Sequence, residues 1–204
     1  MTIHLRKMYV DSRYGQLHMH TAFPSSGGFD ELTPLICIGT AAQTGRAFRP
    51  LLRDLGRDRS AYAPDLPGSG ESDGPHESPS VTDYAAGCLD LIDSLRMRRV
   101  DVLGYQTGST AAIELALARP EQVRRVALVG VPLAEAGFQA GERLPLLKQP
   151  VMIVRAKDDY WDSTGRTETL LRDARRVELP NFGANLLDAG TEAIANLARE
   201  FFDR

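Results

Sequence analysis

Two glycines enclose a short turn near the middle of the chain, in the sequence Gly104-Tyr105-Gln106-Thr107-Gly108. Small residues two positions from the apex let a strand and a helix pass closely, and the pattern G-x-S-x-G uses such a strained turn to display a nucleophilic serine. Here the apex is Gln106, whose amide is neither a useful nucleophile nor a base near neutral pH, because its lone pair is delocalised. The five residues by themselves also fit a plain strand–helix turn.

Side chains that could transfer a proton are few, since the chain has only His4, His18, His20 and His76 as histidines. His76 follows the segment AYAPD and is expected near the mouth of a pocket, where it is either a displaced base or a solvated loop residue. His18 and His20 share one face of a predicted strand. Two imidazoles without a third ligand nearby are better interpreted as ordinary strand residues than as metal ligands. We therefore expect no metal and no cofactor.

Composition favours one soluble domain over residues 1–204, with 43% hydrophobic residues, 25% charged residues and a formal charge of -3. There is no basic stripe, which argues against nucleic acid as a partner. No apolar run reaches the ~20 residues that a membrane helix needs. The first residues lack the apolar core of a signal peptide, which favours the cytoplasm. Cys37 and Cys88 are expected to be buried structural thiols.

Strand and helix patterns alternate from Pro34 onward. Apolar runs predict strands, and three-and-four spacing predicts helices between them. The strands are expected at 34–39, 60–65, 100–104, 126–131, 151–154 and 175–179, and the helices at 45–56, 81–97, 107–118, near 166–174 and at the C-terminal end.

The beginning of the chain has a different pattern, because residues 7–22 alternate around a turn at Tyr14–Gly15 and predict a hairpin. The fold class is therefore α/β: a three-layer sandwich with a mostly parallel central sheet of about seven or eight strands and an N-terminal antiparallel hairpin. Ligands bind at the carboxyl ends of the strands in such sheets, so the Gln106 turn lies at the expected site.

Five stretches, in order, make the chain resemble the α/β-hydrolase fold family. They are IGTAAQTGRAFRPLLRDL, YAPDLPGSGESDGP, GSTAAIELALARPEQVRRVALVGVP, QPVMIVRAKDD and VELPNFGANLLDAGTEAIANLAREFF. They are similar to the family's oxyanion loop and first helix, the loop after its fourth strand, its nucleophile helix and next strand, the strand before the triad acid, and the histidine loop with the last helix.

The resemblance implies a degenerate catalytic triad. The family's nucleophile falls on Gln106 and its acid on Asp159, with Asp158 as the alternative. The family's histidine falls on Ala184, or on Asn185 if the alignment shifts by one residue. The orienting acid is therefore expected to remain, whereas the groups that it would serve are absent.

The resemblance also implies an oxyanion hole in the backbone. The N–H of Thr40, after Gly39, and the N–H of Thr107, at a helix N-terminus, are the expected donors. Together with His76 these residues are the candidate ligand-binding positions, and a small carbonyl or carboxylate compound is the expected ligand.

The segment Val131 to Pro150, where relatives often insert a helical cap, is too short here for a large cap domain. The pocket is then either shallow or covered by another chain. Apolar residues in this segment could form a homodimer contact. They are Leu133, Phe138, Leu144, Leu146 and Leu147.

Three functions stay open. The first is a pseudoenzyme that binds a small molecule or a protein partner without hydrolysing anything. The second is a hydrolase or a cofactor-free enzyme that uses other groups, with Thr107 or Ser109 as nucleophile or His76 as base. The third is a structural role in an assembly.

Overall fold

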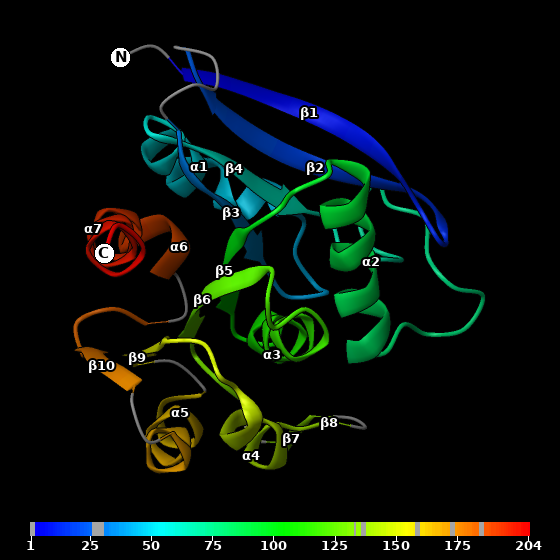
Figure 1. Ribbon diagram of the computed structural model, residues 1–204. Coiled ribbons are helices and arrows are strands. Elements are labelled where there is room, and N and C mark those ends of the chain that lie inside the picture. Colours follow the sequence, from blue (N-terminus) through cyan, green and yellow to red (C-terminus); the bar gives the residue numbers. More distant parts are fainter. Residues whose placement is uncertain are drawn as a thin grey trace.

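An eight-stranded sheet runs through the computed structural model (Figure 1). The structure describes residues 3–25, 31–132, 134–135, 138–157, 160–171, 174–183 and 186–204. The strand order is β1-β2-β4-β3-β5-β6-β9-β10. The pairs β1–β2 and β2–β4 are antiparallel, and all later neighbours are parallel. The predicted fold class, with its N-terminal antiparallel hairpin, is confirmed.

The strands of this sheet are β1 (Ile3–Ser12), β2 (Gly15–Pro24), β3 (Leu32–Ile38), β4 (Arg59–Pro64), β5 (Val100–Tyr105), β6 (Val123–Val129), β9 (Val151–Ala156) and β10 (Ala174–Leu179). The α-helices are α1 (Arg49–Leu55), α2 (Val81–Ser94), α3 (Gly108–Ala118), α4 (Ala140–Arg143), α5 (Trp161–Thr167), α6 (Leu186–Ala189) and α7 (Thr191–Phe202). Short 3-10 turns are η1 (Gly45–Phe48), η2 (Leu144–Leu146) and η3 (Glu168–Leu170), and β7 (Ala134–Glu135) pairs with β8 (Phe138–Gln139).

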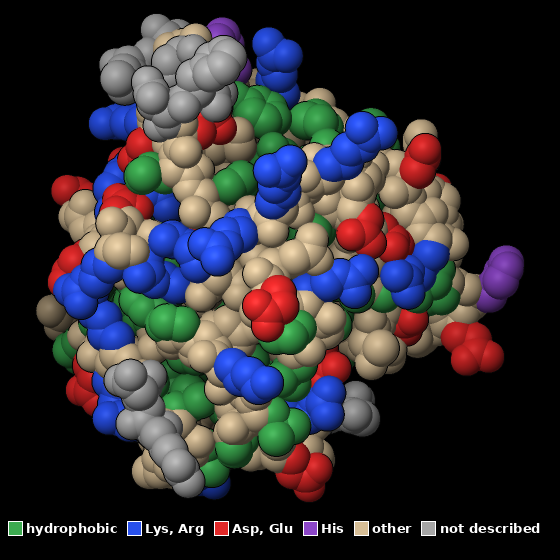
Figure 2. All heavy atoms as spheres, viewed as in Figure 1, with side chains coloured by type: hydrophobic (Ala, Val, Ile, Leu, Met, Phe, Trp, Pro, Cys, Tyr) green, Lys and Arg blue, Asp and Glu red, His purple; other side chains and the backbone are tan. Residues whose placement is uncertain are grey.

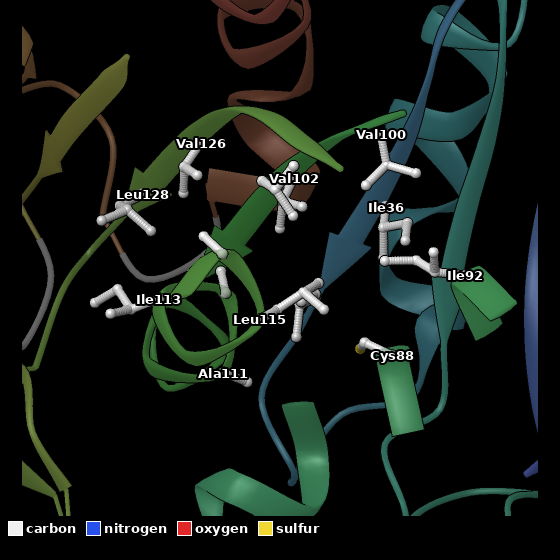
Figure 3. Packing of buried hydrophobic residues seen from close by; sticks show 14 of the residues in the cluster. Ile36, Cys88, Ile92, Val100, Val102, Ala111, Ile113, Leu115, Val126 and Leu128 are labelled. Carbon is white, nitrogen blue, oxygen red and sulfur yellow. The ribbon is translucent and has the colours of Figure 1, made fainter. Parts of the chain in front are cut away.

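Helices cover both faces of the sheet, with α2 and α3 on one face and α1, α6 and α7 on the other (Figure 1). Successive strand residues point to opposite faces, so each strand feeds two cores. In β5, Val102 packs toward α2 and α3, whereas Leu103 belongs to the core under α1 and α7. Figure 3 shows the first core, where Ile36 and Val102 meet Cys88 and Leu115 from the helices.

Local signals in the sequence place some element ends correctly. The Ser80 hydroxyl accepts a hydrogen bond from the Asp83 N–H, and the Asp83 carboxylate accepts one from the Ser80 N–H, so this reciprocal pair caps the start of α2. The predicted helix near 166–174 is wrong. α5 begins earlier, at Trp161, and β10 already begins at Ala174.

The segment between β6 and β9 forms the β7–β8 ribbon, α4 and η2, which are short elements, as the sequence predicts for this region. Leu144 is fully buried in the chain's own core and therefore cannot contribute to a dimer contact, contrary to expectation. Leu146 is 54% exposed. Leu133 and the side chain of Phe138 lie outside the described part of the structure.

The surface carries mixed charge, and basic and acidic side chains lie next to one another on the face drawn in Figure 2. None of the helices described here has both the length and the apolar character needed to cross a lipid bilayer.

Candidate functional site

Gln106 occupies the turn between β5 and α3 and has a positive φ of 50°. An L-residue in this left-handed region carries strain of about 1–3 kcal/mol, which the surrounding structure must offset. Two backbone hydrogen bonds hold the turn: the Gln106 N–H donates to the Val129 carbonyl at 2.7 Å, and the Ser109 N–H donates to the Gln106 carbonyl at 2.8 Å. The strained conformation predicted at this apex is confirmed.

The glycines on either side allow this close packing. A Cβ atom on Gly104 would lie 2.6 Å from the Ser109 Cα, and one on Gly108 would lie 2.2 Å from the Ile38 carbonyl oxygen. Side chains cannot occupy such space without a shift of the backbone. The first turn of α3 therefore lies directly against the end of β3, which brings the loop that follows Ile38 beside the Gln106 turn.

Two backbone N–H groups belong to the segments that contact each other at this junction. Thr40 follows the end of β3 and is 9% exposed, and Thr107 is the N-cap of α3. Within the described residues, neither the Thr40 N–H nor the Thr107 N–H donates a hydrogen bond to another group of the chain. The start of a helix carries partial positive charge, so a carbonyl or carboxylate oxygen would be stabilised there.

Two aromatic residues lie under the apex, and neither was singled out from the sequence. The Gln106 side-chain Nε2 donates to the Tyr105 hydroxyl at 3.3 Å. The Tyr105 ring is buried and meets the Phe48 ring edge to face, with their centroids 6.5 Å apart. A Cβ atom on Gly39 would lie only 3.0 Å from Phe48. The sequence does contain a signal for Tyr105: side chains alternate between the two faces of the sheet along β5, and this alternation places Tyr105 on the face that α1 covers.

The alternative nucleophiles differ in access. Ser109 is fully buried, and its hydroxyl makes long contacts of 3.5 and 3.4 Å with the carbonyls of Val129 and Gly130. Thr107 is half-buried beside the apex. His76 is exposed in the loop between β4 and α2, and in the described part of the chain no hydrogen bond or ion pair joins it to the turn.

The positions predicted for the triad acid and histidine, Asp159 or Asp158 and Ala184 or Asn185, lie outside the described residues. Their neighbours along the chain are described. The Lys157 N–H donates to the Phe182 carbonyl at 2.8 Å, and Gly183 lies beside the Lys157 carbonyl. The loops after β9 and β10 therefore begin side by side.

The histidines of the hairpin do share a face, with the ring centroids of His18 and His20 5.3 Å apart. His18 Nδ1 lies 2.9 Å from a carboxylate oxygen of Asp65. Over the described ranges, no three His, Cys, Asp or Glu side chains are grouped closely enough to hold a metal ion.

Both cysteines are buried and unbridged, as predicted. Burial raises the pKa of the Cys37 thiol and of the Cys88 thiol to about 12. Neither thiol is ionised at neutral pH, so neither is a reactive nucleophile.

The chain is similar to several proteins that are named as hydrolases. Residues 35–201 match the model of the "Alpha/beta hydrolase family". The chain is 25% identical over 128 residues to an uncharacterized carboxylesterase, nap, from Bacillus subtilis, in a match that covers 62% of this chain and 41% of that protein. It is 30% identical over 110 residues to the 2-hydroxymuconate semialdehyde hydrolase of Pseudomonas sp. strain CF600, covering 52% of this chain and 38% of that protein. The chain thus spans less than half the length of these two relatives.

Solved structures agree in fold. The enol-lactonase from Burkholderia xenovorans LB400 is similar with a TM-score of 0.85 and 15% identity, covering 97% of this chain and 100% of that chain. The naproxen esterase from Bacillus subtilis has a TM-score of 0.81 and 18% identity, covering 98% and 92%. The family model matches most of the chain's length, and the eight-stranded, mostly parallel sheet agrees with it. The chain therefore belongs to the alpha/beta hydrolase family.

Proposed function

We propose that this protein binds a small carbonyl or carboxylate compound at the Gln106 turn and does not hydrolyse it. The observation that carries the proposal is the strained turn itself: Gln106 has the positive φ suited to displaying a nucleophile, yet its side chain is an amide. A turn that costs stability and displays no nucleophile still positions the Thr107 N–H beside its apex, next to the segment that carries Thr40.

The proposed loss of hydrolysis follows from the chemistry of the triad. In serine hydrolases the nucleophile and the histidine act as a unit, and removing either costs on the order of a millionfold in kcat. By the resemblance stated above, the corresponding residues are Gln106 and Ala184. Asp159 would then remain without an imidazole to orient.

Binding is supported by the donors that remain. The N–H groups of Thr40 and Thr107 have no acceptor in the described part of the chain, and they lie on segments that contact each other through Gly108. An oxygen atom of a carbonyl or carboxylate would accept from both. The Gln106 amide, already bonded to Tyr105, adds a further polar group at the same place.

The test measures binding and turnover in one set of proteins. Acetate and butyrate are titrated against the 15N-labelled protein, and p-nitrophenyl butyrate is the probe of hydrolysis. Thr107→Pro removes one donor at a residue whose φ of -61° already suits proline. Thr82→Pro in the first turn of α2 is the matched control, and thermal melts report whether either variant stays folded.

We expect carboxylate-dependent shifts at residues 40 and 107 that weaken in Thr107→Pro and persist in Thr82→Pro, together with no ester turnover above that of an unrelated protein. Absence of any shift at these residues would remove the binding proposal. If Thr107→Pro does not fold, Gln106→Trp, which places a bulky side chain at the apex, supplies the same comparison.

A second candidate is hydrolysis by other groups in the same pocket, favoured by the relatives, which are named as hydrolases. Thr107 is the hydroxyl suited to this role because it is half-buried next to the apex, whereas Ser109 is fully buried. Ester turnover by the wild type that disappears in Thr107→Ala or His76→Ala would favour this candidate over binding alone.

A further inference from the structure

A second polar cavity lies away from the Gln106 turn. It has a volume of about 250 Å³ and is lined from β1, β2, η1 and α1 and from the loop after β4. We call it the His18 cavity, after His18 in its wall; the basic side chains around it are Lys7, Arg46 and Arg49. A water molecule occupies about 30 Å³ of liquid, so this space can hold a small ion with part of its hydration shell.

The wall of the cavity contains a buried histidine, one of whose ring nitrogens is left unpaired by the described residues. His18 is 1% exposed, and its Nδ1 lies 2.9 Å from the Asp65 carboxylate. The same carboxylate accepts hydrogen bonds from the N–H groups of Gly45 and Glu71, which fixes its position. The other ring nitrogen of His18, Nε2, is buried and has no hydrogen-bond partner among the residues that the structure describes. Buried polar atoms are nearly always satisfied, so this nitrogen is a candidate contact for a ligand bound in the cavity.

The charges around the cavity are unbalanced. Glu71 is already engaged by the Lys7 ammonium at 3.1 Å and by the Tyr9 hydroxyl, and Asp65 is engaged by His18. Arg46 and Arg49 are exposed and form no ion pair with any described residue. Two guanidinium groups without counter-charges match one dianion, and their planar forks suit the oxygens of a phosphate group.

An adjoining cavity of about 110 Å³ extends the same environment. It shares Lys7, His20 and Arg49 with the His18 cavity and adds Arg6, and no carboxylate lines it.

The His20 side chain, which lines both cavities, is 6% exposed. Burial, and then the positive charges of its neighbours His18, Arg49 and Lys7, lower its pKa, whereas the Asp65 carboxylate opposes the shift. A bound anion would oppose this shift too, so the His20 resonances offer a direct readout of occupancy.

The geometry points to a binding site for a phosphate-type dianion in the His18 cavity, held by Arg46 and Arg49 and contacted by His18 Nε2. With Nδ1 on a carboxylate, Nε2 is either an N–H donor or a bare acceptor. Phosphate suits both, because near neutral pH it carries unprotonated oxygens together with a protonated one, which is always present in the free ion and present in part of the population of a monoester. Sulfate and carboxylates lack the protonated oxygen. Free phosphate and phosphate monoesters share this chemistry.

The experiment titrates the 15N-labelled protein at constant ionic strength with inorganic phosphate, phenyl phosphate, sulfate and acetate, following the His18 and His20 ring nitrogens. Arg46→Gln with Arg49→Gln removes the two guanidinium groups that would hold the anion. The control is Arg53→Gln, an exposed arginine of α1 that does not line the cavity. His18→Gln tests the ring, and the arginine variants stay informative if that buried substitution does not fold.

We expect phosphate to shift the His18 and His20 signals with saturation, and affinity to fall at least about tenfold in the double arginine variant and to stay unchanged in Arg53→Gln. Equal binding of phenyl phosphate would assign the site to the phosphate group of a monoester, and weaker binding would assign it to the free ion. Equal shifts with sulfate and acetate, equal loss in Arg53→Gln, or no saturation would overturn the proposal.

Discussion

The Lys157 N–H donates a hydrogen bond to the Phe182 carbonyl across 2.8 Å, and this bond links the start of the loop after β9 to the start of the loop after β10. The two positions that the family resemblance gives to the acid and the histidine follow immediately, at Asp159 and Ala184. Both loops leave the same edge of the sheet as the Gln106 turn, because β5, β9 and β10 are parallel.

Rebuilding the triad is the first prediction. Gln106→Ser with Ala184→His should raise turnover of p-nitrophenyl butyrate at least about tenfold above the wild type, because a nucleophile and its base act as a unit. Each single substitution should give much less. Adding Asp159→Asn to the double variant should remove the gain. A double variant as inactive as the wild type would mean that these positions no longer converge.

Packing at the start of α3 gives a second prediction. Gly108→Ala should lower the free energy of unfolding by about 1–3 kcal/mol, because the new Cβ would lie 2.2 Å from the Ile38 carbonyl oxygen. Gly183→Ala is the control, since its nearest heavy atom would be 3.3 Å away. Denaturant titrations of the two variants check the difference, and equal losses would contradict the close approach of β3 and α3.

Backbone strain at Gln106 gives a third prediction. Gln106→Gly should be more stable than Gln106→Ala by about 1 kcal/mol, since glycine adopts a φ of 50° without a Cβ penalty. At Asn196, an exposed position within α7, the order should reverse and alanine should be the more stable variant. Thermal melts of the four proteins measure both differences. The same order at both positions would argue against strain at Gln106.

The buried imidazole of His20 predicts a pH dependence. Burial, and then the charge of His18, lower the pKa of His20 in the folded protein. Below about pH 6.5 the unfolded chain therefore binds a proton at His20 more readily than the folded protein does. The free energy of unfolding should therefore fall as the pH drops through this range, and less steeply in His20→Gln. Denaturation at several pH values measures the slope. His76→Gln, at an exposed position, controls for the loss of an imidazole.

Self-association through residues 131–150 is the fifth prediction. Leu146 is 54% exposed and lies beside a cavity of about 370 Å³ whose wall includes Leu147 and Leu170. Sedimentation should show a dimer at high concentration that Leu146→Glu weakens. Glu121→Lys, at an exposed position outside this segment, should leave it unchanged. A wild type that stays monomeric throughout would refute the contact.

Most of the fold follows from local patterns in the sequence. The apolar runs and the three-and-four spacing indicate which residues are buried, and the Ser80–Asp83 pair indicates where α2 begins. These elements therefore lie close to where the sequence predicts them. The glycines at 104 and 108 likewise indicated a strained turn, because only a close approach of backbones requires them.

The helix predicted near 166–174 failed for a tertiary reason. The sequence of α5, WDSTGRT, has no apolar periodicity to reveal it. The Arg155 side chain stacks on the Trp161 ring at 3.9 Å and donates to the Trp161 carbonyl, and the Thr164 hydroxyl accepts from the Val131 N–H. Side chains from other segments hold this helix in place, and no local pattern encodes them.

The sequence by itself determined the fold class, the strained turn and the amide at its apex. Only the tertiary structure placed Tyr105 under that amide and set His18 against Asp65, 47 residues further along the chain. Local patterns record which residues prefer burial and which turns the backbone can make. The meeting of two polar side chains depends on strand order and register, which are decided when the whole sheet packs.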